Sequence, residues 1–584
     1  MKHHLAIACS LLALTACDKT PEQTTKTLPL QVSAADTIYF GGDILTMTGD
    51  KPEYAQAIAT QGEKIIFVGD KNKALEHKFG KTKMIDLQGK TLMPGFVDGH
   101  SHVYGVGLQA LVANVLPSPD GDANSVEQIV NILTAAQNNP DYTTFIKKTG
   151  AILGFGYDDA ELDRYPTKMD LDRVSTEKPV IIIHTSGHLS VANSKALAMA
   201  GIDENTDNPD GGLIRRMANS QEPNGVLEEN AHFGLLFKLM QSFDPDLQDL
   251  MLQEVQKLYT KYGYTTAQEG RATQEAYDSM VRASKADKFV IDVVAYADMA
   301  TSSSFMDSPY NSKNYTNHFR IGGVKLNFDG SPQGKTAWLS HPYLKAPEGQ
   351  EQGYAGYPTF NDEQAYQYIE TAFANDWQVM THANGDAAIE QFLNAVENAN
   401  NKLGKKDRRP VLIHGQTIRQ DQVNRLKELG IFPSLFPMHT FYWGDWHVNS
   451  VLGHPRADFI SPTHAVRKQG LMFSTHHDAP VALPNALRVL DATVNRTTRT
   501  DQVLGPDQRV SVYTALQAMT IWPAYQHFEE SSKGQLKQGM QADLIILDNN
   551  PLKIKPTELH NLQVLETISR GETVYSKNYT NSLN

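Results

Sequence analysis

The stretch LMPGFVDGHSHVYG, Leu92 to Gly105, ends an apolar run with two histidines one residue apart, His100 and His102. On a β-strand, residues i and i+2 point to the same side, so both imidazoles can converge on one point at the end of such a strand. Two polar turn residues have the same spacing. Whether the pair forms a site therefore depends on the residues at the ends of the other apolar runs of the chain.

Seven further short apolar runs alternate with helical patterns from Leu247 onward. The pattern around Ile389, Phe392, Leu393 and Val396 has the three- and four-residue spacing of an amphipathic helix. The apolar runs are GYTTAQ, FVIDVVAYAD, IGGVKLNF, WQVMTH, RPVLIH, IFPSLF and LMFSTHHD. Together with the first run, eight strands alternating with helices predict an α/β fold, a (β/α)8 TIM barrel with its catalytic groups at the carboxyl ends of the strands.

The 584 residues exceed the usual size of one domain, so we expect additional modules. Residues 36–92 and 523–584 contain short β-type runs without helical periodicity, which predicts one small β-sandwich built from both chain ends. The barrel domain then occupies residues 93–522. Residues 106–246 are too many for a single crossover after the first barrel strand and predict an inserted subdomain over the barrel mouth.

Composition excludes several classes of protein. The chain is 40% hydrophobic and 20% charged, as in ordinary soluble globular proteins. Its net charge of −13 opposes binding to phosphate backbones, so no nucleic-acid partner is expected. Only two cysteines occur, Cys9 and Cys17, so neither disulfides nor thiol ligands are expected in the folded part.

The first residues resemble the signal of a bacterial lipoprotein. The apolar run Leu5 to Ala16 is too short to span a bilayer and suits a secretory signal. Leu14-Thr15-Ala16-Cys17 resembles the lipoprotein box, which implies a signal peptide over 1–17, a lipidated Cys17 and a linker over 18–35. Asp18 resembles the signal that retains lipoproteins at the inner membrane. We expect a periplasm-facing protein that contacts the membrane through lipidated Cys17 only.

Titratable residues fall consistently at the strands of the predicted barrel. Besides His100 and His102 on the first strand, they are Lys325 on the fourth, His382 on the fifth, His414 on the sixth and Asp478 on the eighth. Neutral imidazoles and carboxylates are ligands that suit zinc. Three purely structural interpretations stay open: Lys325 as a partly buried lysine paired with Asp329, His414 as a core histidine, and Asp478 as a loop cap.

This set resembles the amidohydrolase superfamily, whose pattern is His-x-His, Lys, His, His, Asp on those same strands. It is more closely similar to the YtcJ-like or amidohydrolase-3 branch, through MPGFVDGHSH, SGHLSVANSKAL, GVKLNFDGSPQGKTA, THANGDAAIEQ, IHGQ, HHDAPV and GQLKQGMQADLIILDNNPL. The resemblance extends from residue 36 to the end. One departure is His477, which stands where the pattern commonly has a serine.

The resemblance implies a metal-dependent hydrolase that acts on a carbon–nitrogen bond of the amide type. It implies two divalent metals, zinc first, held by His100, His102, Lys325, His382, His414 and Asp478, with a carboxylated Lys325 as the bridge. Metal binding lowers the pKa of water to about 7 and so supplies hydroxide at neutral pH. Asp478 is then the expected catalytic acid and base, which passes the proton to the leaving nitrogen.

Four further residues are candidates for binding a small amide-type substrate. His188 and His439 are placed to bind a carbonyl or a carboxylate, or else simply pack. Lys335 is a candidate for an anion, although lysines are mostly solvated, and His477 is a candidate through its departure from the pattern. The aromatic cluster at 441–446 is either the wall of an apolar pocket or core.

Two rival functions remain. The same metal site would also hydrolyse an ester or a cyclic amide, because attack by hydroxide is common to all three. A catalytically inactive lipoprotein that binds solutes is the alternative from another class. A serine hydrolase is disfavoured, since no G-x-S-x-G motif is found. A homodimer is left open as the assembly.

Overall fold

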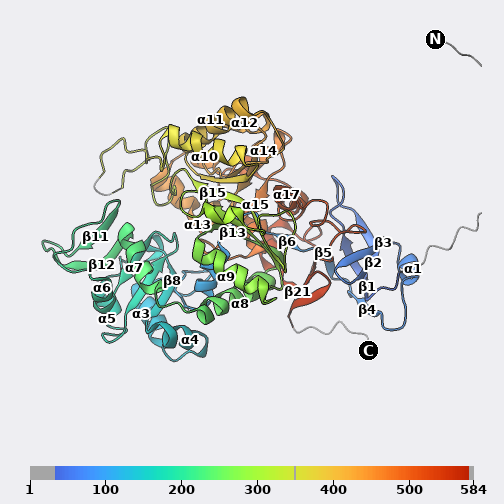
Figure 1. Cartoon of the computed structure of the whole chain (residues 1–584), viewed down its shortest axis with the longest axis horizontal. Helices are drawn as coiled ribbons and strands as arrows, with labels where there is room; N and C mark the ends of the chain where they lie inside the picture. The colour runs from blue at the N-terminus through green and yellow to red at the C-terminus, as the bar shows by residue number, and fades with distance from the viewer. Residues whose placement is uncertain (1–32, 348–349, 578–584) are drawn as a thin grey trace, which may run out of the picture.

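A computed structural model describes residues 33–347 and 350–577, and they form three sheets with surrounding helices. In Figure 1 the strands near the amino terminus lie at the right, the helices α10 to α12 at the top and a separate αβ unit at the left. The central sheet lies between the two outer ones. Cys17 and Asp18 lie outside the described residues.

The central sheet has eight strands in chain order, all paired in parallel. The sheet curls so that its last strand approaches its first, and the Asp478 N–H donates to the His100 carbonyl at 3.2 Å. No ladder joins these two edge strands within the described ranges. The strands are β6 (Phe96–Val97), β13 (Tyr264–Ala272), β14 (Asp292–Asp298), β15 (Phe319–Asn327), β16 (Gln378–Ala383), β17 (Val411–His414), β18 (Phe432–Leu435) and β19 (Ser474–Thr475).

Helices cover this sheet between and after its strands. Ile389, Phe392, Leu393 and Val396 are fully buried on one face, as their spacing predicts. β14 is buried at every residue, which is usual for a parallel strand covered on both faces. The helices are α8 (Pro245–Lys261), α9 (Gln274–Lys285), α10 (Asp362–Ala374), α11 (Asp386–Leu403), α12 (Gln420–Leu429), α13 (Met438–Trp446), α14 (Thr463–Lys468), α15 (Ala486–Asn495), α16 (Val512–Gln517) and α17 (Ile521–Gln526).

The first apolar run contributes strands to two different sheets and is therefore not one continuous strand. β5 (Thr91–Pro94) belongs to the sheet of the chain ends, and the short β6 that follows belongs to the central sheet. Gly95 lies between them, and its N–H donates to the Asp543 carbonyl at 2.9 Å. A Cβ at Gly95 would lie 2.5 Å from side-chain atoms of Thr265, so the close approach of the two strands requires glycine.

Strands from both ends of the chain form a second sheet of eight strands. β5 lies in its middle, between β1 from the amino-terminal part and β20 from the carboxyl-terminal part. The strands are β1 (Thr37–Leu45), β2 (Tyr54–Gln61), β3 (Lys64–Gly69), β4 (Lys83–Asp86), β20 (Leu544–Leu547), β21 (Val564–Ser569) and β22 (Glu572–Ser576), with the short helix α1 (Lys71–Leu75). The predicted β-runs at both ends are thus strands.

A third sheet, of six strands, lies in the chain between β6 and β13 and forms the unit at the left of Figure 1. Its order is β11-β12-β10-β9-β8-β7. The strands are β7 (Ala113–Asn114), β8 (Ile152–Tyr157), β9 (Val180–His184), β10 (Leu189–Ala192), β11 (Gly212–Arg216) and β12 (Pro223–Glu229). The helices of this segment are α2 (Val103–Ala110), α3 (Val126–Ala136), α4 (Pro140–Thr149), α5 (Lys168–Asp172), α6 (Ser194–Ala200) and α7 (Asn230–Met240).

None of the helices in the described ranges combines the length and the apolar character that a bilayer crossing requires.

Candidate metal centre

The two histidines of the first motif lie just beyond β6 rather than on it. The His100 N–H donates to Asp98 Oδ1 at 3.0 Å, and the His102 N–H donates to the Ala479 carbonyl at 2.8 Å. The expectation that strand alternation brings both imidazoles together is therefore corrected. Backbone hydrogen bonds of the loop after β6 hold them instead, and their rings lie 5.1 Å apart between centroids.

The other four side chains come from the strands that the sequence indicates. Lys325 lies in β15, His382 in β16 and His414 at the end of β17, while Asp478 lies three residues beyond β19. His414 has a φ of +70° and Asp478 a φ of +52°, conformations that residues other than glycine rarely adopt. Such backbone is retained where the surrounding structure demands one side-chain direction, and here both side chains point to the same centre.

Three of the histidines lie around the Asp478 carboxylate. Asp478 Oδ1 lies 3.5 Å from His100 Nε2 and 3.4 Å from His102 Nε2. Asp478 Oδ2 lies 3.8 Å from His414 Nε2. One ligand atom from each of His100, His414 and Asp478 lies within 4.8 Å of the others, an arrangement compatible with a metal ion. Their identity as metal ligands remains a prediction.

Lys325 and His382 complete the cluster. Lys325 Nζ lies 2.8 Å from His100 Nε2, and His382 Nδ1 lies 3.1 Å from His414 Nε2. The structural interpretation of Lys325 required Asp329 as its ion-pair partner. Asp329 instead accepts hydrogen bonds from three backbone N–H groups, those of Trp338, Asn384 and Gly385. Lys325 is thus directed at the histidine cluster.

The hydrogen bonds assign which ring nitrogens offer a lone pair. His100 Nδ1 donates to Gln268 Oε1 at 2.6 Å, which leaves Nε2 free to coordinate. His382 Nε2 lies 3.0 Å from the Gly330 carbonyl oxygen and 3.1 Å from Asn384 Nδ2, and Nδ1 faces His414 Nε2. Outer partners of this kind orient the histidines of metal sites in general.

The residues present fit a divalent cation. Asp478 Oδ1 is buried and has no hydrogen-bond partner in the described part of the chain, an arrangement that is costly for a carboxylate unless a positive charge is near. Burial lowers the pKa of His100 and His414 well below the usual value and that of His382 to about 3, so these imidazoles are neutral. Burial also lowers the pKa of Lys325 to about 7.

The sequence analysis did not predict the residues that support this cluster. Gln268 and Glu269 lie near the end of β13, and Glu269 Oε1 is 3.8 Å from His102 Nδ1. His476 is fully buried, with its ring 5.3 Å from that of His100 and 5.1 Å from that of His414. A polar pair ending GYTTAQE and a histidine two residues before Asp478 were the available signals.

The candidates for substrate binding differ in their exposure and in the groups that they contact. His188 is half exposed, with Nδ1 2.9 Å from Glu229 Oε2. His439 is buried, and its ring lies 6.3 Å from that of His414. The buried Lys335 donates to Ser450 Oγ at 2.9 Å and lies 5.0 Å from the centre of the Trp446 ring. Lys335 is therefore not a solvated surface lysine.

His477 lies on the interior side of the cluster. It is fully buried, and its ring is 5.1 Å from that of Tyr264 and 5.7 Å from that of Tyr259. His477 Nε2 lies 3.5 Å from Asp98 Oδ1. In this position His477 offers a substrate no exposed surface, so its predicted role in substrate binding is not supported by the geometry.

A second group with metal-ligand types lies at the ends of β8 and β9, where Asp158, Asp159 and His184 come together. The Ser186 N–H donates to His184 Nδ1 at 3.0 Å, so Nε2 must carry the ring proton. That nitrogen lies 3.0 Å from Asp159 Oδ1. The group is therefore a histidine–carboxylate pair whose ring has no lone pair left for a cation.

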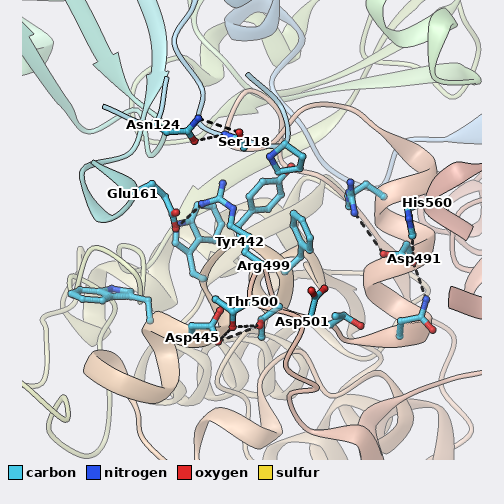
Figure 2. Close-up of a pocket in the computed structure, with 18 of the residues that line it drawn as sticks. Ser118, Asn124, Glu161, Tyr442, Asp445, Asp491, Arg499, Thr500, Asp501 and His560 are labelled. Atoms are coloured by element: carbon cyan, nitrogen blue, oxygen red, sulfur yellow. Dashed lines mark hydrogen bonds and ion pairs between the residues drawn. The ribbon is translucent and has the colours of Figure 1, made fainter. Parts of the chain in front are cut away.

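The aromatic cluster lines a cavity of about 870 Å³ beside α13 (Figure 2). The walls are not apolar, because Arg499 Nη1 lies 3.0 Å from Glu161 Oε1 and His560 Nδ1 lies 3.6 Å from Asp491 Oδ1. The aromatic members of the wall are Phe441, Tyr442, Trp443 and Trp446. The ring of Trp443, which lines the cavity, lies 5.7 Å from that of His439.

Known proteins of similar sequence and structure identify the family of this chain. Residues 83–575 match the profile of the amidohydrolase family. The YtcJ protein of Bacillus subtilis is 28% identical over 92% of this chain and 99% of its own. The N-substituted formamide deformylase of Arthrobacter pascens is 25% identical over 90% of this chain and 95% of its own.

Among solved structures, an uncharacterized metal-dependent hydrolase from Pyrococcus furiosus has a TM-score of 0.69 and 25% identity, over 88% of this chain and 100% of that one. With more than half of its length matched by the profile, this chain belongs to the amidohydrolase family. The resemblance inferred from the motifs is confirmed.

Proposed function

We propose that this protein hydrolyses a carbon–nitrogen bond of the amide type at a centre of two divalent metals, zinc first. The observation that carries the proposal is the convergence of three histidines on an Asp478 carboxylate whose Oδ1 lacks a hydrogen-bond partner among the described residues. The kinship to an N-substituted formamide deformylase supports an amide substrate.

The ligands divide into two groups around Lys325. His100, His102 and Asp478 would hold the inner metal, and His382 and His414 the outer one. Lys325 would bridge both as a carbamate, because an ammonium has no lone pair for a cation. Burial favours the neutral amine, the form that combines with carbon dioxide. Bound metals would supply hydroxide at neutral pH and polarise the scissile carbonyl.

Asp478 is proposed as the group that moves the proton. Its Oδ1 lies within 3.5 Å of His100 Nε2 and His102 Nε2, where it would help to hold the inner metal. The carboxylate would take a proton from the attacking water and deliver it to the departing nitrogen, which makes the amine a neutral leaving group. His188 and His439 would lie on the substrate side of the cluster.

The first experiment removes the proposed bridge. Purified protein should contain divalent metal by elemental analysis, and chelation should abolish hydrolysis of a panel of formamides and N-acyl amino acids. Lys325→Ala should lose metal and activity, and short carboxylates such as acetate should restore part of both. Full hydrolysis by a folded, metal-free preparation would contradict the proposal.

Esters and lactams belong in the same panel, because hydrolysis of an ester or a cyclic amide is the second candidate at this site. Retained solute affinity without metal or turnover would instead favour the solute-binding lipoprotein.

We further propose that the curled sheet is a (β/α)8 barrel, flanked by a β-sandwich of both chain ends and an inserted subdomain over its mouth. Eight parallel strands in chain order and the position of the six-stranded unit between β6 and β13 support this description. The lipid anchor at Cys17, with the periplasmic location that Asp18 favours, is a proposal from the sequence alone. Labelling with a fatty-acid analogue, compared between wild type and Cys17→Ser, would test the anchor.

A further inference from the structure

Arg271 lies at the carboxyl end of β13, on the strand that also supplies Gln268 and Glu269 to the metal centre. Its backbone N–H donates to Glu269 Oε1 at 3.2 Å. Glu269 in turn pairs with His102 through an isolated β-bridge of the backbone. The Arg271 side chain is 50% exposed, whereas the residues before it are buried. It is therefore a solvent-accessible cation on the strand that supports the candidate site.

One edge of the guanidinium is held and the other is free. Arg271 Nε donates to Asp298 Oδ2 at 2.6 Å. Asp298 is itself fixed, because its Oδ1 accepts from the N–H groups of Ala300 and Thr301. Neither terminal nitrogen of Arg271 has a hydrogen-bond partner among residues 33–347 and 350–577. A rigid fork of donors is thus oriented by the protein and left unsatisfied.

The ion pair that holds Arg271 lies beside the strand of a proposed metal ligand. Asp298 in β14 is the register partner of Lys325 in β15, so the ion pair lies against the strand position of the bridging lysine.

We propose that the terminal nitrogens of Arg271 bind a carboxylate of the substrate, so that the enzyme prefers amides that carry an anionic group. This inference rests on the proposed function and names its substrate class. The planar fork of an arginine matches the two oxygens of a carboxylate, and pairing through Nε with Asp298 aims the fork without using its terminal N–H groups.

The test compares two probes that differ only in charge, 3-phenylpropionate and 3-phenylpropionamide, by calorimetry on the metal-loaded protein. The wild type should bind the carboxylate at least about tenfold more tightly than the carboxamide, and Arg271→Met should lose about 10- to 100-fold of the carboxylate affinity. Affinity for the carboxamide should stay within a factor of about two, since it does not depend on the charge.

Two further variants separate recognition from structure. Arg271→Lys retains the charge and loses the fork, so an intermediate carboxylate affinity is expected. Arg282→Met removes a half-exposed arginine of α9 that pairs with Asp249, and both probes should bind it as they bind the wild type. Equal loss of both probes in Arg271→Met, or unchanged carboxylate binding, would overturn the inference.

Kinetics extend the comparison to substrates. For N-formylphenylalanine, Arg271→Met should raise KM and leave kcat nearly unchanged, while N-formylphenylalaninamide should be hydrolysed as before. A protein that holds no metal and hydrolyses neither compound would contradict the proposed function. In that case the same calorimetric comparison, made with the protein as purified, would still decide whether Arg271 binds the carboxylate.

Discussion

Gln268 determines which nitrogen His100 can offer. Its Oε1 accepts from His100 Nδ1, and its Nε2 donates to the Gly99 carbonyl at 3.0 Å, which prevents the amide from turning over. The imidazole is thereby fixed in the tautomer whose Nε2 faces Lys325 and Asp478. A single neutral side chain outside the predicted ligand set thus prepares a ligand.

Replacing Gln268 by Met should weaken metal binding by about 10- to 100-fold, because His100 loses the acceptor that fixes its tautomer. Titration of the metal-free protein against a competing chelator measures this affinity. Gln256→Met, at a buried glutamine of α8 bonded to the Leu252 and Lys288 carbonyls, is the matched control and should leave the affinity unchanged. Equal affinity of Gln268→Met and the wild type would remove Gln268 from the site.

At the scale of elements, β13 approaches the loop after β6 so closely that only a glycine fits. The Gly270 N–H donates to the Ser101 carbonyl at 2.7 Å. A Cβ at Gly270 would lie 2.3 Å from His100 Cε1 and 2.8 Å from the Ser101 carbonyl oxygen. Strand and loop are therefore in direct contact at the ligand, and the position of His100 depends on the absence of a side chain.

Gly270→Ala should displace His100, lower the free energy of unfolding by about 1–3 kcal/mol through overpacking, and reduce bound metal. Thermal unfolding and elemental analysis of the purified variant measure the two effects. Gly234→Ala in α7 meets nothing within 4 Å and should be neutral or stabilising by up to about 1 kcal/mol. An unaltered metal content in Gly270→Ala would show that the loop can move away.

At the scale of the whole molecule, a buried ionic network connects the central sheet to the carboxyl-terminal part of the chain. Glu529 Oε1 accepts from Arg320 of β15, and Glu529 Oε2 lies 2.9 Å from Lys533 Nζ. Lys533 also lies 2.6 Å from Asp292 of β14, which in turn pairs with Arg570 in the turn between β21 and β22. The network lies at the amino ends of these strands, opposite the metal centre, and is therefore structural.

The network should make stability depend on acid. Although burial alone would raise the pKa of Glu529, Lys533 and Arg320 hold it at about 2, below the ordinary value of 4.5. A depressed carboxyl pKa stabilises the fold above the unfolded value, so this contribution should be lost as the pH falls from 4.5 towards 2. Denaturant unfolding between pH 7 and pH 2 measures the effect.

Glu529→Gln should lower the free energy of unfolding by about 3–5 kcal/mol at pH 7, since Arg320 would keep a buried charge without its carboxylate partner and Lys533 would retain only Asp292. The variant should also lose less stability below pH 4.5 than the wild type. Glu254→Gln, which breaks a surface pair with Lys257, should cost about 0.5 kcal/mol and leave the acid dependence intact. Parallel pH profiles of Glu529→Gln and the wild type would refute this role.

Much of the fold followed from local pattern. The helix at Asp386–Leu403 and the strands that carry Lys325, His382 and His414 lie where periodicity predicts them. The division of the first run into β5 and β6 did not follow, because the contacts of Gly95 with Asp543 and Thr265 come from residues far away in the chain. A local sequence pattern predicts that a residue is buried, but it does not predict which sheet buries that residue.

The sequence by itself determined the alternation of strands and helices, the family, and the six residues proposed as ligands, because strand ends and motif spacing are properties of neighbouring residues. Only the tertiary structure decided which groups support those six and that His477 faces the interior. It also decided that Arg271 pairs with Asp298, the register partner of Lys325, while its terminal nitrogens have no hydrogen-bond partner among the described residues. These outcomes depend on distances between strands that chain order leaves open. Directions of side chains are decided by what packs against them.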